Sequence, residues 1–461
     1  MIVLFPDQDT TIATLRKSAK QHRRVLLQAP TGWGKSIASA SMIKRSQSLG
    51  KTAHFVVPRR QLIDQMSENF SKFNIDHSFI AAGYPFREDA LTHICSLDTV
   101  MDKDIRQPDV TFVDETHYGR DKIIQHCARL ERRIIGLSAT PMFMSGKPMG
   151  DLYDDMVVGP SVEWLIANKR LSNFNYFAPT KLDLSGVNID KPNELSDFMT
   201  EKKAVIGNAA DHYKKTAMGK LDITFCVDIK HSQFTAERFR DAGITAVHVD
   251  GKTPDDERAR IFKAFARREI LRLTCASLLV FGFDLEAATG GIKVTVESMT
   301  DLDPTHSLPK QMQKWGRTLR AKPYPAIISD HVGNYLRHGL PDFDREWTLA
   351  GGCSSRDADG KPIPTTQCPS CYLIHRPTPV CPRCGHERPV QERKLNYMPG
   401  DLAMIRRDEA QKAARAAEDE RRRLRREEGA ARSLGDFEAI ARARGYHPKW
   451  ALHKARARGY V

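Results

Sequence analysis

A glycine-rich loop, Ala29–Ser36, is the feature of this sequence that most constrains its fold. The apolar run Val25–Leu27 before it predicts a buried strand, and Ile37–Arg45 after it predicts a helix. In such a strand-to-helix loop, glycines aim backbone N–H groups at phosphate oxygens, Lys35 reaches the terminal phosphates, and Ser36 offers its hydroxyl to Mg²⁺. The residues predicted to bind a nucleotide here are Thr31, Gly32, Gly34, Lys35 and Ser36.

The loop departs from the strict phosphate-binding pattern at one position, because Ala29 stands where that pattern begins with glycine. A glycine-rich turn that binds nothing would account for Gly32 and Gly34. It would not account for Lys35 and Ser36 directly after them. The flanking strand and helix therefore favour phosphate binding.

The composition predicts a folded protein with an anionic partner. The 461 residues allow two or three domains, and a hydrophobic content of 41% is ordinary for a soluble chain. No apolar run approaches the roughly 18 residues that a membrane helix needs, and Asp7 comes too early for a signal peptide. We therefore expect a cytoplasmic protein with no membrane association. The net charge of +14 favours a polyanion, although charge alone does not distinguish nucleic acid from an acidic protein.

Strands alternate with amphipathic helices twice along the chain, which predicts two α/β domains with parallel sheets. The join is expected between Val158 and Phe177, and the periodicity fails beyond Pro341. The expected domains are 1–160, 161–345, 346–390 and 391–461, the last a charged helix (Asp401–Glu428) with a basic segment. The predicted strands are Val25–Gln28, His54–Val57, Asp109–Val113, Arg133–Leu137, Ile223–Val227, Ala246–Val249, Arg272–Ala276, Lys293–Val296 and Ala326–Ser329.

An acidic pair, Asp114 and Glu115, follows an apolar strand in the first half. Phosphoryl transfer needs a metal-binding carboxylate and a water-orienting carboxylate, and the carboxyl end of a parallel strand suits both. Asp114 would hold Mg²⁺ and Glu115 would polarise the attacking water. Such a pair is more often a solvated turn, but its place downstream of the glycine-rich loop favours a catalytic site.

From Phe5 to Arg345 the chain resembles the superfamily 2 helicases of the DEAD/DEAH-box class, with Asp114–His117 as a DETH box. Ser138–Pro141 is similar to the motif that links hydrolysis to strand movement, Phe281–Asp284 to motif V, and Gln313–Arg320 to motif VI. The order and spacing of these motifs make the resemblance specific. It implies two RecA-like, doubly wound domains of the P-loop NTPase kind, with ATP and Mg²⁺ as cofactors between them.

The resemblance also implies roles for single residues. Gln8 is similar to the glutamine that reads adenine, and Gly282 and Asp284 of motif V would also bind the cofactor. Arg317 and Arg320 would reach the γ-phosphate from the second domain. The alternative is that both are surface arginines on a helix with no catalytic role. The implied catalytic set is Lys35, Asp114, Glu115, Gln313, Arg317 and Arg320. The implied nucleic-acid contacts, from motifs similar to Ia and its neighbour, are Arg59, Arg60 and Thr99.

Four cysteines form two Cys-x-x-Cys turns: Cys368, Cys371, Cys381 and Cys384. Each turn presents two sulfurs to one ion, so the pattern predicts tetrahedral zinc in a compact ribbon. With four thiolates no ligand position stays open, and the zinc would be structural. Two disulfides are the alternative, which a reducing cytoplasm disfavours. A motor core followed by such a ribbon resembles the RadD-type bacterial helicases and similar phage or prophage enzymes.

The C-terminal segment is basic and contains aromatic residues. The repeated Ala-Arg-Ala-Arg-Gly-Tyr motif supplies the candidate nucleic-acid contacts Arg442, Arg444, Arg456 and Arg458. In one interpretation, the aromatic residues Tyr446 and Trp450 stack on bases of the nucleic acid. In the other, favoured slightly for the aromatics, the segment is a helical hairpin whose core holds Phe437 and Trp450.

The leading hypothesis is an ATP-dependent helicase or translocase acting on branched or duplex DNA in repair, recombination or phage replication. An RNA helicase is a second hypothesis, since the DETH box and basic tail permit it. A third is the motor subunit, or an ATP-dependent DNA-binding module, of a restriction-like system that does not unwind. The expected partners are nucleic acid, DNA favoured over RNA, and a single-stranded-DNA-binding or replication and repair protein. The expected location is the cytoplasm of a bacterial or phage-infected cell.

Overall fold

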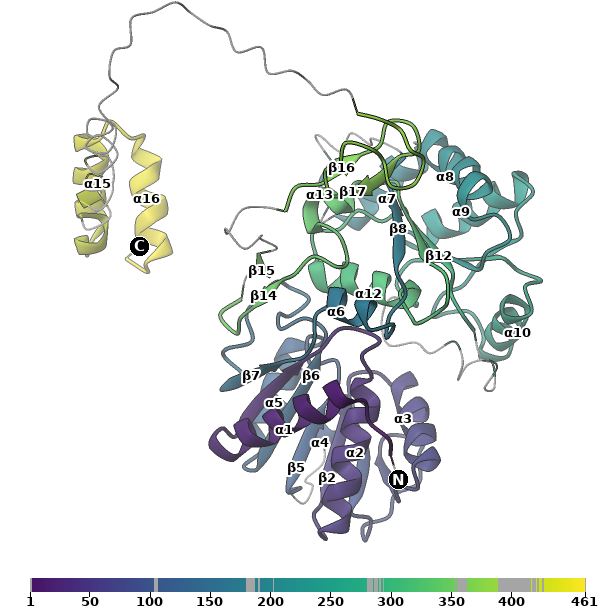
Figure 1. Cartoon of the computed structure of the whole chain (residues 1–461). Helices are drawn as coiled ribbons and strands as arrows, with labels where there is room; N and C mark the ends of the chain where they lie inside the picture. Colours follow the sequence, from purple (N-terminus) through teal and green to yellow (C-terminus); the bar gives the residue numbers. More distant parts are fainter. Residues whose placement is uncertain are drawn as a thin grey trace, which may run out of the picture. The chain divides into compact units, whose positions relative to one another are not determined.

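The computed structural model describes residues 2–102, 107–179, 187–189, 191–201, 203–279, 294–351, 353–354, 363–388 and 427–460, with isolated positions 285, 289, 292, 416, 420 and 423–424. The chain divides into two compact units, Met1–Pro389 and Val390–Val461, each of which is described by itself (Figure 1).

The first sheet of the larger unit has seven parallel strands in the order β3-β4-β2-β5-β6-β1-β7. Its strands are β1 (Arg24–Gln28), β2 (Ala53–Val57), β3 (Ser78–Ile80), β4 (Thr92–Ser96), β5 (Val110–Val113), β6 (Arg133–Ser138) and β7 (Asp155–Val158). Its helices are α1 (Pro6–Gln21), α2 (Lys35–Ser48), α3 (Gln61–Lys72), α4 (Leu97–Asp102) and α5 (Arg120–Arg129).

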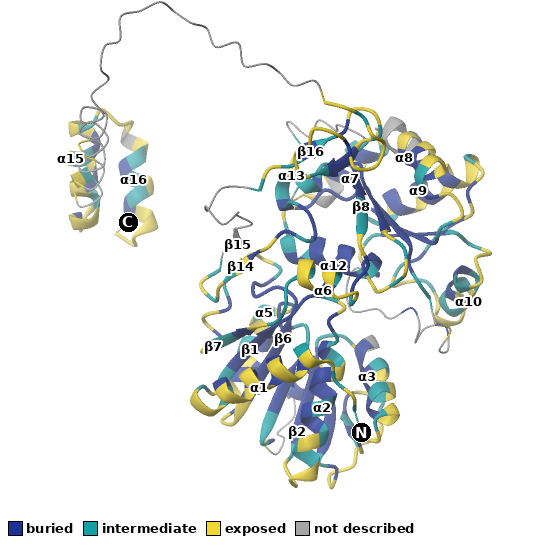
Figure 2. Cartoon of the chain, viewed as in Figure 1, coloured by how far each residue is buried: buried dark blue, intermediate teal, exposed yellow. Residues whose placement is uncertain are grey.

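Alternation along the strands explains why helices cover both faces of this sheet. Val25 and Leu27 of β1 pack in one apolar cluster with side chains of α1, α2 and α3. Leu26, between them, packs in a second cluster with side chains of α4 and α5. Successive strand residues point to opposite faces, so a strand buried on both faces is apolar throughout. Figure 2 shows these strands as buried elements between partly exposed helices.

The second sheet has eight strands in the order β10-β11-β9-β12-β13-β8-β17-β16, of which the first six are parallel. Its strands are β8 (Phe174–Phe177), β9 (Asp222–Phe225), β10 (Ala246–His248), β11 (Arg272–Cys275), β12 (Ser298–Asp301), β13 (Ala326–Asp330), β16 (Thr366–Gln367) and β17 (Leu373–His375). The helices of this half are α6 (Val162–Ala167), α7 (Pro192–Glu201), α8 (Lys203–Thr216), α9 (Ile229–Asp241), α10 (Asp255–Ala266), α12 (Leu308–Thr318) and α13 (Asn334–His338).

The same two-sided packing holds in the second sheet. Phe225 and Met299 pack with α10 and α12, and Phe177 and Ile327 pack with α7, α8 and α9. Figure 1 shows α6 and α12 where the two sheets meet. The expected fold class, two RecA-like α/β domains, is thereby confirmed. The domain boundaries expected near residues 160, 345 and 390 stay a prediction.

Two short hairpins follow the second domain. The strands β14 (Glu346–Trp347) and β15 (Cys353–Ser354) pair with each other. Strands β16 and β17 form an antiparallel hairpin, and β17 pairs with β8 through Leu373 and Ile374. The segment that begins the four-cysteine motif therefore extends the second sheet.

The sequence placed one strand wrongly and missed several others. The prediction of a strand at Lys293–Val296 was wrong, because the strand of that region is β12, a few residues later. Strands β3, β4, β7 and β8 carried no sequence prediction. Two of them, β7 and β8, lie within or beside the region expected to join the domains.

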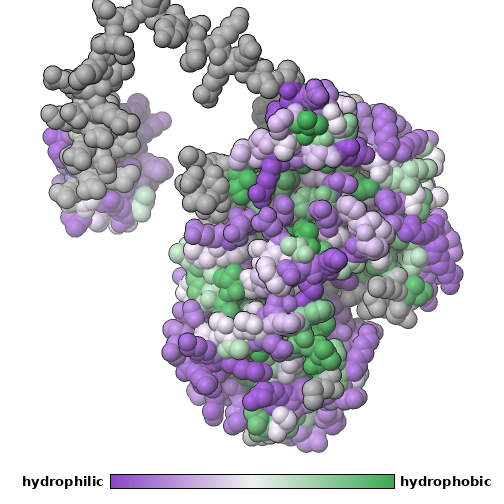
Figure 3. Space-filling model, in the orientation of Figure 1, coloured by the Kyte–Doolittle hydropathy of each residue, from purple (hydrophilic) through white to green (hydrophobic). Residues whose placement is uncertain are grey.

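The smaller unit contains a helical hairpin of α15 (Leu434–Ala443) and α16 (Pro448–Ala457). Its core holds Ala431, Phe437, Ala441, Ala451 and Ala455, with Trp450 packed against it. Most of the charged helix expected over 401–428 lies outside the described residues. In the part of the chain that the structure describes, no helix has the length and apolar content needed to cross a membrane. Hydrophilic side chains occupy much of the visible face of the molecule (Figure 3).

Candidate functional site

The phosphate loop stands between β1 and α2, and its glycines are required by its geometry. Gly32 and Gly34 have φ values of 89° and 101°, in the left-handed region that favours glycine. A Cβ on Gly34 would lie 2.6 Å from the Gln8 amide nitrogen. Lys35 is the first residue of α2, and its Nζ donates to the carbonyl oxygens of Ala29 at 2.8 Å and Pro30 at 3.3 Å.

Gln8, expected to read adenine, is buried against this loop. Its Nε2 donates to the carbonyl of Trp33 at 2.8 Å, and its Oε1 accepts from the backbone N–H of Phe5 at 3.0 Å. The side chain is 1% exposed. In this structure the Gln8 amide thus joins the start of α1 to the phosphate loop, and its adenine-reading role stays a prediction.

The acidic pair follows β5, at the same edge of the sheet as the phosphate loop. Glu115 has a φ of 44°, an uncommon conformation for a residue other than glycine. Its carboxylate Oε2 lies 3.3 Å from His117 Nδ1 and accepts from Gln313 Nε2 at 3.2 Å. Burial and the neighbouring charge of Glu115 raise the pKa of the Asp114 carboxyl to about 7.

His117 connects Glu115 to the end of β6. Its Nδ1 also lies 3.0 Å from Ser138 Oγ, which in turn donates to the carbonyl of Thr140 at 2.6 Å. Burial lowers the pKa of the His117 imidazole and favours its neutral form. The sequence placed His117, Ser138 and Thr140 in motifs but named none of them as a site residue. Their place in the motifs was the signal that could have found them.

Helix α12 brings the motif VI residues to this edge of the first domain. Gln313, Gly316 and Arg317 lie on α12 at the spacing that puts residues on one helical face, and Arg320 lies beyond the end of the helix at Thr318. Gln313 contacts Glu115, and a Cβ on Gly316 would lie 2.5 Å from Thr31 of the phosphate loop. Arg317 is half-buried and Arg320 is exposed. The structure thus brings Lys35, Glu115 and α12 together across the two sheets.

These residues fit a magnesium-bound nucleotide. The buried Thr31 Oγ1 has no hydrogen-bond partner among the described residues, and a phosphate oxygen would supply one. Lys35 forms no salt bridge with Asp114 or Glu115 within the described chain, so its charge is available to phosphate. Ser36, at the start of α2, and Asp114 would hold Mg²⁺. Gly282 and Asp284 lie outside the described residues.

Both predicted nucleic-acid arginines of the first domain lie beside tyrosines. The Arg59 guanidinium donates to Tyr118 Oη at 2.7 Å and stands over the Tyr118 ring at 4.6 Å. Arg60 stands over the Tyr84 ring at 5.5 Å. Thr99 is half-buried in α4. A small cavity has Arg59 and Tyr118 in its wall together with Glu115 and Gln313, so this surface adjoins the acidic pair.

The arginines of the tail differ in what they contact. Arg444 donates to the carboxylates of Glu427 and Glu428, both at 2.8 Å, and Arg458 donates to the Glu428 carbonyl at 2.6 Å. Arg442 and Arg456 are exposed. Arg442 also donates to the Glu438 carbonyl at 3.4 Å, so three of the four predicted contacts are engaged within the smaller unit in this structure.

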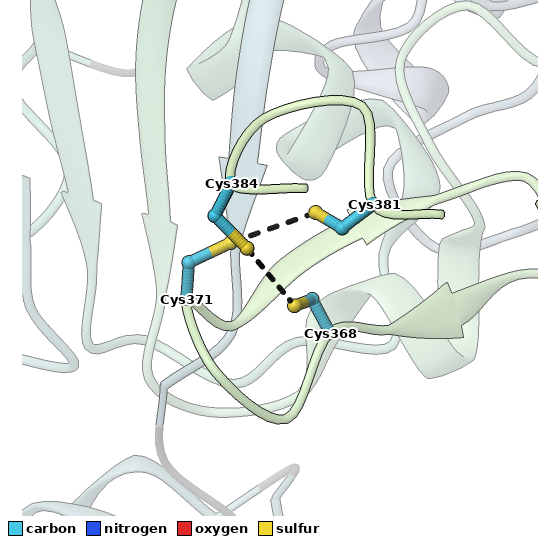
Figure 4. A group of neighbouring side chains, drawn as sticks. All are labelled: Cys368, Cys371, Cys381 and Cys384. Carbon is cyan, nitrogen blue, oxygen red and sulfur yellow. Dashed lines mark hydrogen bonds between the residues drawn. The ribbon is translucent and has the colours of Figure 1, made fainter. Parts of the chain in front are cut away.

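The four cysteines converge on one point (Figure 4). Their sulfur atoms all lie within 4.8 Å of one another. Sγ of Cys368 lies 3.6 Å from Sγ of Cys384, and Sγ of Cys371 lies 3.8 Å from Sγ of Cys381, well beyond a disulfide bond of about 2.05 Å. The cluster fits tetrahedral coordination of zinc. It leaves no position for a substrate, so a metal here would be structural.

A larger recess, of about 860 Å³, lies at the opposite edge of the first sheet. Its wall includes Val110 and Arg133, which begin β5 and β6, and residues from the ends of α1 and α2. No residue of the phosphate loop or the acidic pair lines it. Its size does not make it the reaction site, because the groups that phosphoryl transfer needs are at the other edge.

Comparison with known proteins agrees with this arrangement. Two family models match the chain: Type III restriction enzyme, res subunit, over residues 1–143, and helicase conserved C-terminal domain, over residues 202–322. A 51.5 kDa protein of Lactococcus phage (isolate 7-9) is 32% identical over 378 residues, which cover 80% of this chain and 79% of the phage protein.

Two restriction enzymes share the fold. A fragment of a putative HsdR subunit of a type I enzyme from Vibrio vulnificus YJ016 is similar with a TM-score of 0.56 at 16% identity, over 73% of this chain and 66% of that one. The type ISP restriction-modification enzyme LlaBIII, bound to DNA, gives 0.53 at 14% identity, over 71% of this chain and 27% of that one. The chain thus corresponds to part of the length of both.

Two α/β sheets, the first parallel and the second largely so, with a phosphate loop, an acidic pair and a facing motif VI helix, define an ATP-dependent motor enzyme of the P-loop NTPase class. The chain belongs to the superfamily 2 helicases.

Proposed function

We propose that this protein is an ATP-dependent helicase or translocase that acts on branched or duplex-containing DNA in repair, recombination or phage replication. The observation that carries the proposal is the contact of Gln313 on α12 with Glu115, 3.2 Å across the two sheets. It brings the arginine-bearing helix of one domain against the acidic pair of the other, and hydrolysis then depends on how the domains meet.

The chain's own residues have distinct tasks in this proposal. Lys35 neutralises the terminal phosphates, and Glu115, in contact with His117, orients and polarises the attacking water. Arg317 and Arg320 stabilise the charge that develops in the transition state. When bound, Mg²⁺ supplies charge neutralisation between the phosphates, with Ser36 and Asp114 as its protein groups.

Three features support DNA rather than RNA as the partner. The four-cysteine hairpin follows the motor core in the order typical of RadD-type helicases. The fold is similar to a restriction enzyme that binds DNA, and the related protein comes from a bacteriophage. Arg59, Arg60, Thr99, Arg442 and Arg456 are the proposed contacts to the strand. A bacterial or phage-infected cytoplasm is the proposed location, with a single-stranded-DNA-binding or repair protein as a second partner.

A second candidate is the motor subunit of a restriction-like system, which moves on DNA without separating strands. The match of residues 1–143 to the restriction res subunit family favours it. An RNA helicase is the third candidate.

Parallel unwinding assays separate these candidates. Labelled DNA forks, blunt DNA duplexes and RNA hybrids are incubated with ATP and the full-length protein, with Glu115→Gln as the inactive control. We expect ATP-dependent separation of DNA forks. Displacement of a bound protein from DNA without strand separation would replace the proposal with the restriction-motor function, and separation of RNA hybrids alone would replace it with the RNA helicase.

A further inference from the structure

A short segment between α6 and β8 touches both halves of the nucleotide site. This coupling segment, Lys169–Ser172, directly precedes the second sheet. Its backbone is fixed by the end of α6, because Arg170 and Leu171 donate to the carbonyl of Leu165 at 2.8 and 3.2 Å. Lys169 adopts a φ of 58°, in the left-handed region that residues other than glycine seldom occupy. No motif or role was predicted for this segment from the amino-acid pattern.

The Arg170 side chain holds the base of the phosphate loop. Its guanidinium donates to Asp7 Oδ1 at 2.7 Å and to the carbonyl of Trp33 at 3.3 Å, and it stacks over the Phe5 ring at 3.3 Å from the centroid. Asp7 Oδ2 in turn accepts from the Trp33 indole at 2.7 Å. The side chains of Arg170 and Asp7 are only 13% and 10% exposed, so solvent screens this ion pair weakly.

The next two residues, Leu171 and Ser172, join the phosphate loop to the other wall of the site. Leu171 lies so close to Gly32 that a Cβ there would be 2.8 Å from its Cδ2. Leu171 also forms an antiparallel bridge with Arg320, and Ser172 donates its N–H to the carbonyl of Leu319 at 2.9 Å. Three consecutive residues thus join the phosphate loop to the end of the arginine-bearing helix α12.

We propose that Arg170 is a positioning residue for nucleotide hydrolysis, through which the coupling segment ties the phosphate loop to the motif VI arginines. The inference rests on the proposed function, since it assigns regulation of the same site. Because the segment is held at both ends, a displacement of the loop shifts Leu319 and Arg320, and a displacement of α12 shifts Trp33. Nucleotide binding and domain engagement are thereby coupled through packed groups.

The test compares Arg170→Gln with a matched control, Arg376→Gln, in the full-length protein. Arg376 forms an exposed ion pair with Glu163 of α6 at 3.5 Å and is not among the residues that contact the loop. We expect Arg170→Gln to raise the KM for ATP and to lower the stimulation of turnover by DNA, each by about tenfold, as expected of a coupling residue. Arg376→Gln should stay within about twofold of the wild type, as expected of an exposed pair.

Three further variants distinguish positioning from mere structural support. Asp7→Asn should reproduce the rise in KM, and the double variant Asp7→Asn/Arg170→Gln should be no worse than either single one, because the residues act as a unit. Arg170→Lys keeps the ion pair but not the fork-shaped contacts, and should recover part of the loss. Additive effects in the double variant, or wild-type kinetics in Arg170→Gln, would overturn the inference.

Hydrogen exchange without nucleotide gives a readout that needs no turnover. Arg170→Gln should speed exchange of the amides in Ala29–Ser36 and, in the same sample, of those around Leu319. Faster exchange at the loop alone would contradict the coupling. An inactive wild-type enzyme would overturn the proposed function, and the exchange result would still decide this inference.

Discussion

The two sheets each place buried charge at their carboxyl edge, but within the described residues only one of the two clusters has its lysine paired with carboxylates. In the second domain, Lys314 Nζ lies 2.9 Å from Asp301 Oδ1 and 2.7 Å from Asp303 Oδ2, and all three side chains are almost fully buried. In the first domain, Lys35 hydrogen-bonds, among the described residues, only to carbonyl oxygens of its own loop, although Asp114 and Glu115 follow a strand of the same sheet.

The pKa values show the same contrast. Burial lowers the pKa of Lys35, and the nearby acidic charges do not overcome that effect. Burial also acts on Lys314, yet there Asp301 and Asp303 more than offset it and raise the pKa of the ammonium group. The carboxyl edges of the two sheets thus differ. The second holds a closed cluster, Lys314 with Asp301 and Asp303, which stabilises the fold. The first holds an open cluster, Lys35 with Asp114 and Glu115, which is suited to a ligand.

The largest expected effect is on catalysis at the open cluster. Glu115→Gln should lower ATP turnover by about 10²- to 10⁴-fold, since it removes the base that polarises water. Binding of ATP should change little because the phosphate loop is intact. Steady-state turnover and nucleotide affinity measure both, with Asp121→Asn, an exposed carboxylate on α5, as the control. Near-normal turnover would remove Glu115 from the mechanism.

Removal of the cation should affect the two clusters oppositely. Lys314→Met leaves two buried carboxylates without their partner and should cost about 3–5 kcal/mol of unfolding free energy. Lys35→Met removes a buried ammonium that has no carboxylate partner in the described chain, so stability should hold or rise while nucleotide binding is lost. Denaturant unfolding of both variants is the measurement. Equal destabilisation would mean that the clusters are not different in kind.

The titration of Asp114 also distinguishes the open cluster from the closed one. The folded pKa of Asp114, about 7, exceeds its ordinary value of 3.8, so its proton stabilises the nucleotide-free fold, and that contribution is lost as pH rises toward 7. Mg²⁺ needs the carboxylate form. Affinity for the magnesium-bound nucleotide should therefore fall up to about tenfold per pH unit below that value. Affinity measured from pH 5 to 8 tests this, and Asp114→Asn should remove the dependence; a flat wild-type profile would contradict it.

Metal removal should act on the edge of the second sheet and leave the closed cluster intact. Loss of zinc should release β17 from β8, because thiolate coordination supplies much of a small module's stability. We expect faster hydrogen exchange at Phe177 and Leu373, with turnover largely retained. Elemental analysis checks the zinc itself. A metal-free preparation whose β8 amides are fully protected would refute the role of the metal.

The tail should give the smallest effect. Deletion of residues 433–461 should reduce the salt dependence of DNA binding by about 0.7–0.9 of a log–log slope unit per lost phosphate contact. Because Arg444 and Arg458 already contact the Glu427–Glu428 pair, few contacts remain to be lost. Binding titrations at several salt concentrations, before and after deletion, measure the slope. Equal salt-dependence slopes for the full-length and truncated proteins would exclude the tail as a nucleic-acid contact.

The sequence predicted those parts of the molecule that depend on local chemistry. The phosphate loop, the acidic pair and the cysteine turns each need particular residues at short spacing, and the family and fold that they indicated are confirmed. The assigned roles of the site residues stay predictions. Periodicity missed β7 and β8 because short strands carry few residues, and their pairing is decided by neighbours far along the chain.

Contacts between residues far apart in the chain could not be predicted from local sequence patterns either. Arg170 carries no motif, and only the fold shows that it contacts Asp7, 163 positions earlier. The closed cluster was equally hidden, since Lys314 stands inside motif VI and its partners Asp301 and Asp303 follow a misplaced strand.

A structure of the protein with Mg²⁺ and a non-hydrolysable ATP analogue tests the central claim most directly. The account predicts the phosphates on the loop Ala29–Ser36, the metal beside Ser36 and Asp114, and the face of α12 that carries Arg317 turned to the γ-phosphate. The Lys314 cluster should be unchanged. Nucleotide bound instead in the recess at the opposite edge of the first sheet, with the phosphate loop unoccupied, would contradict the account.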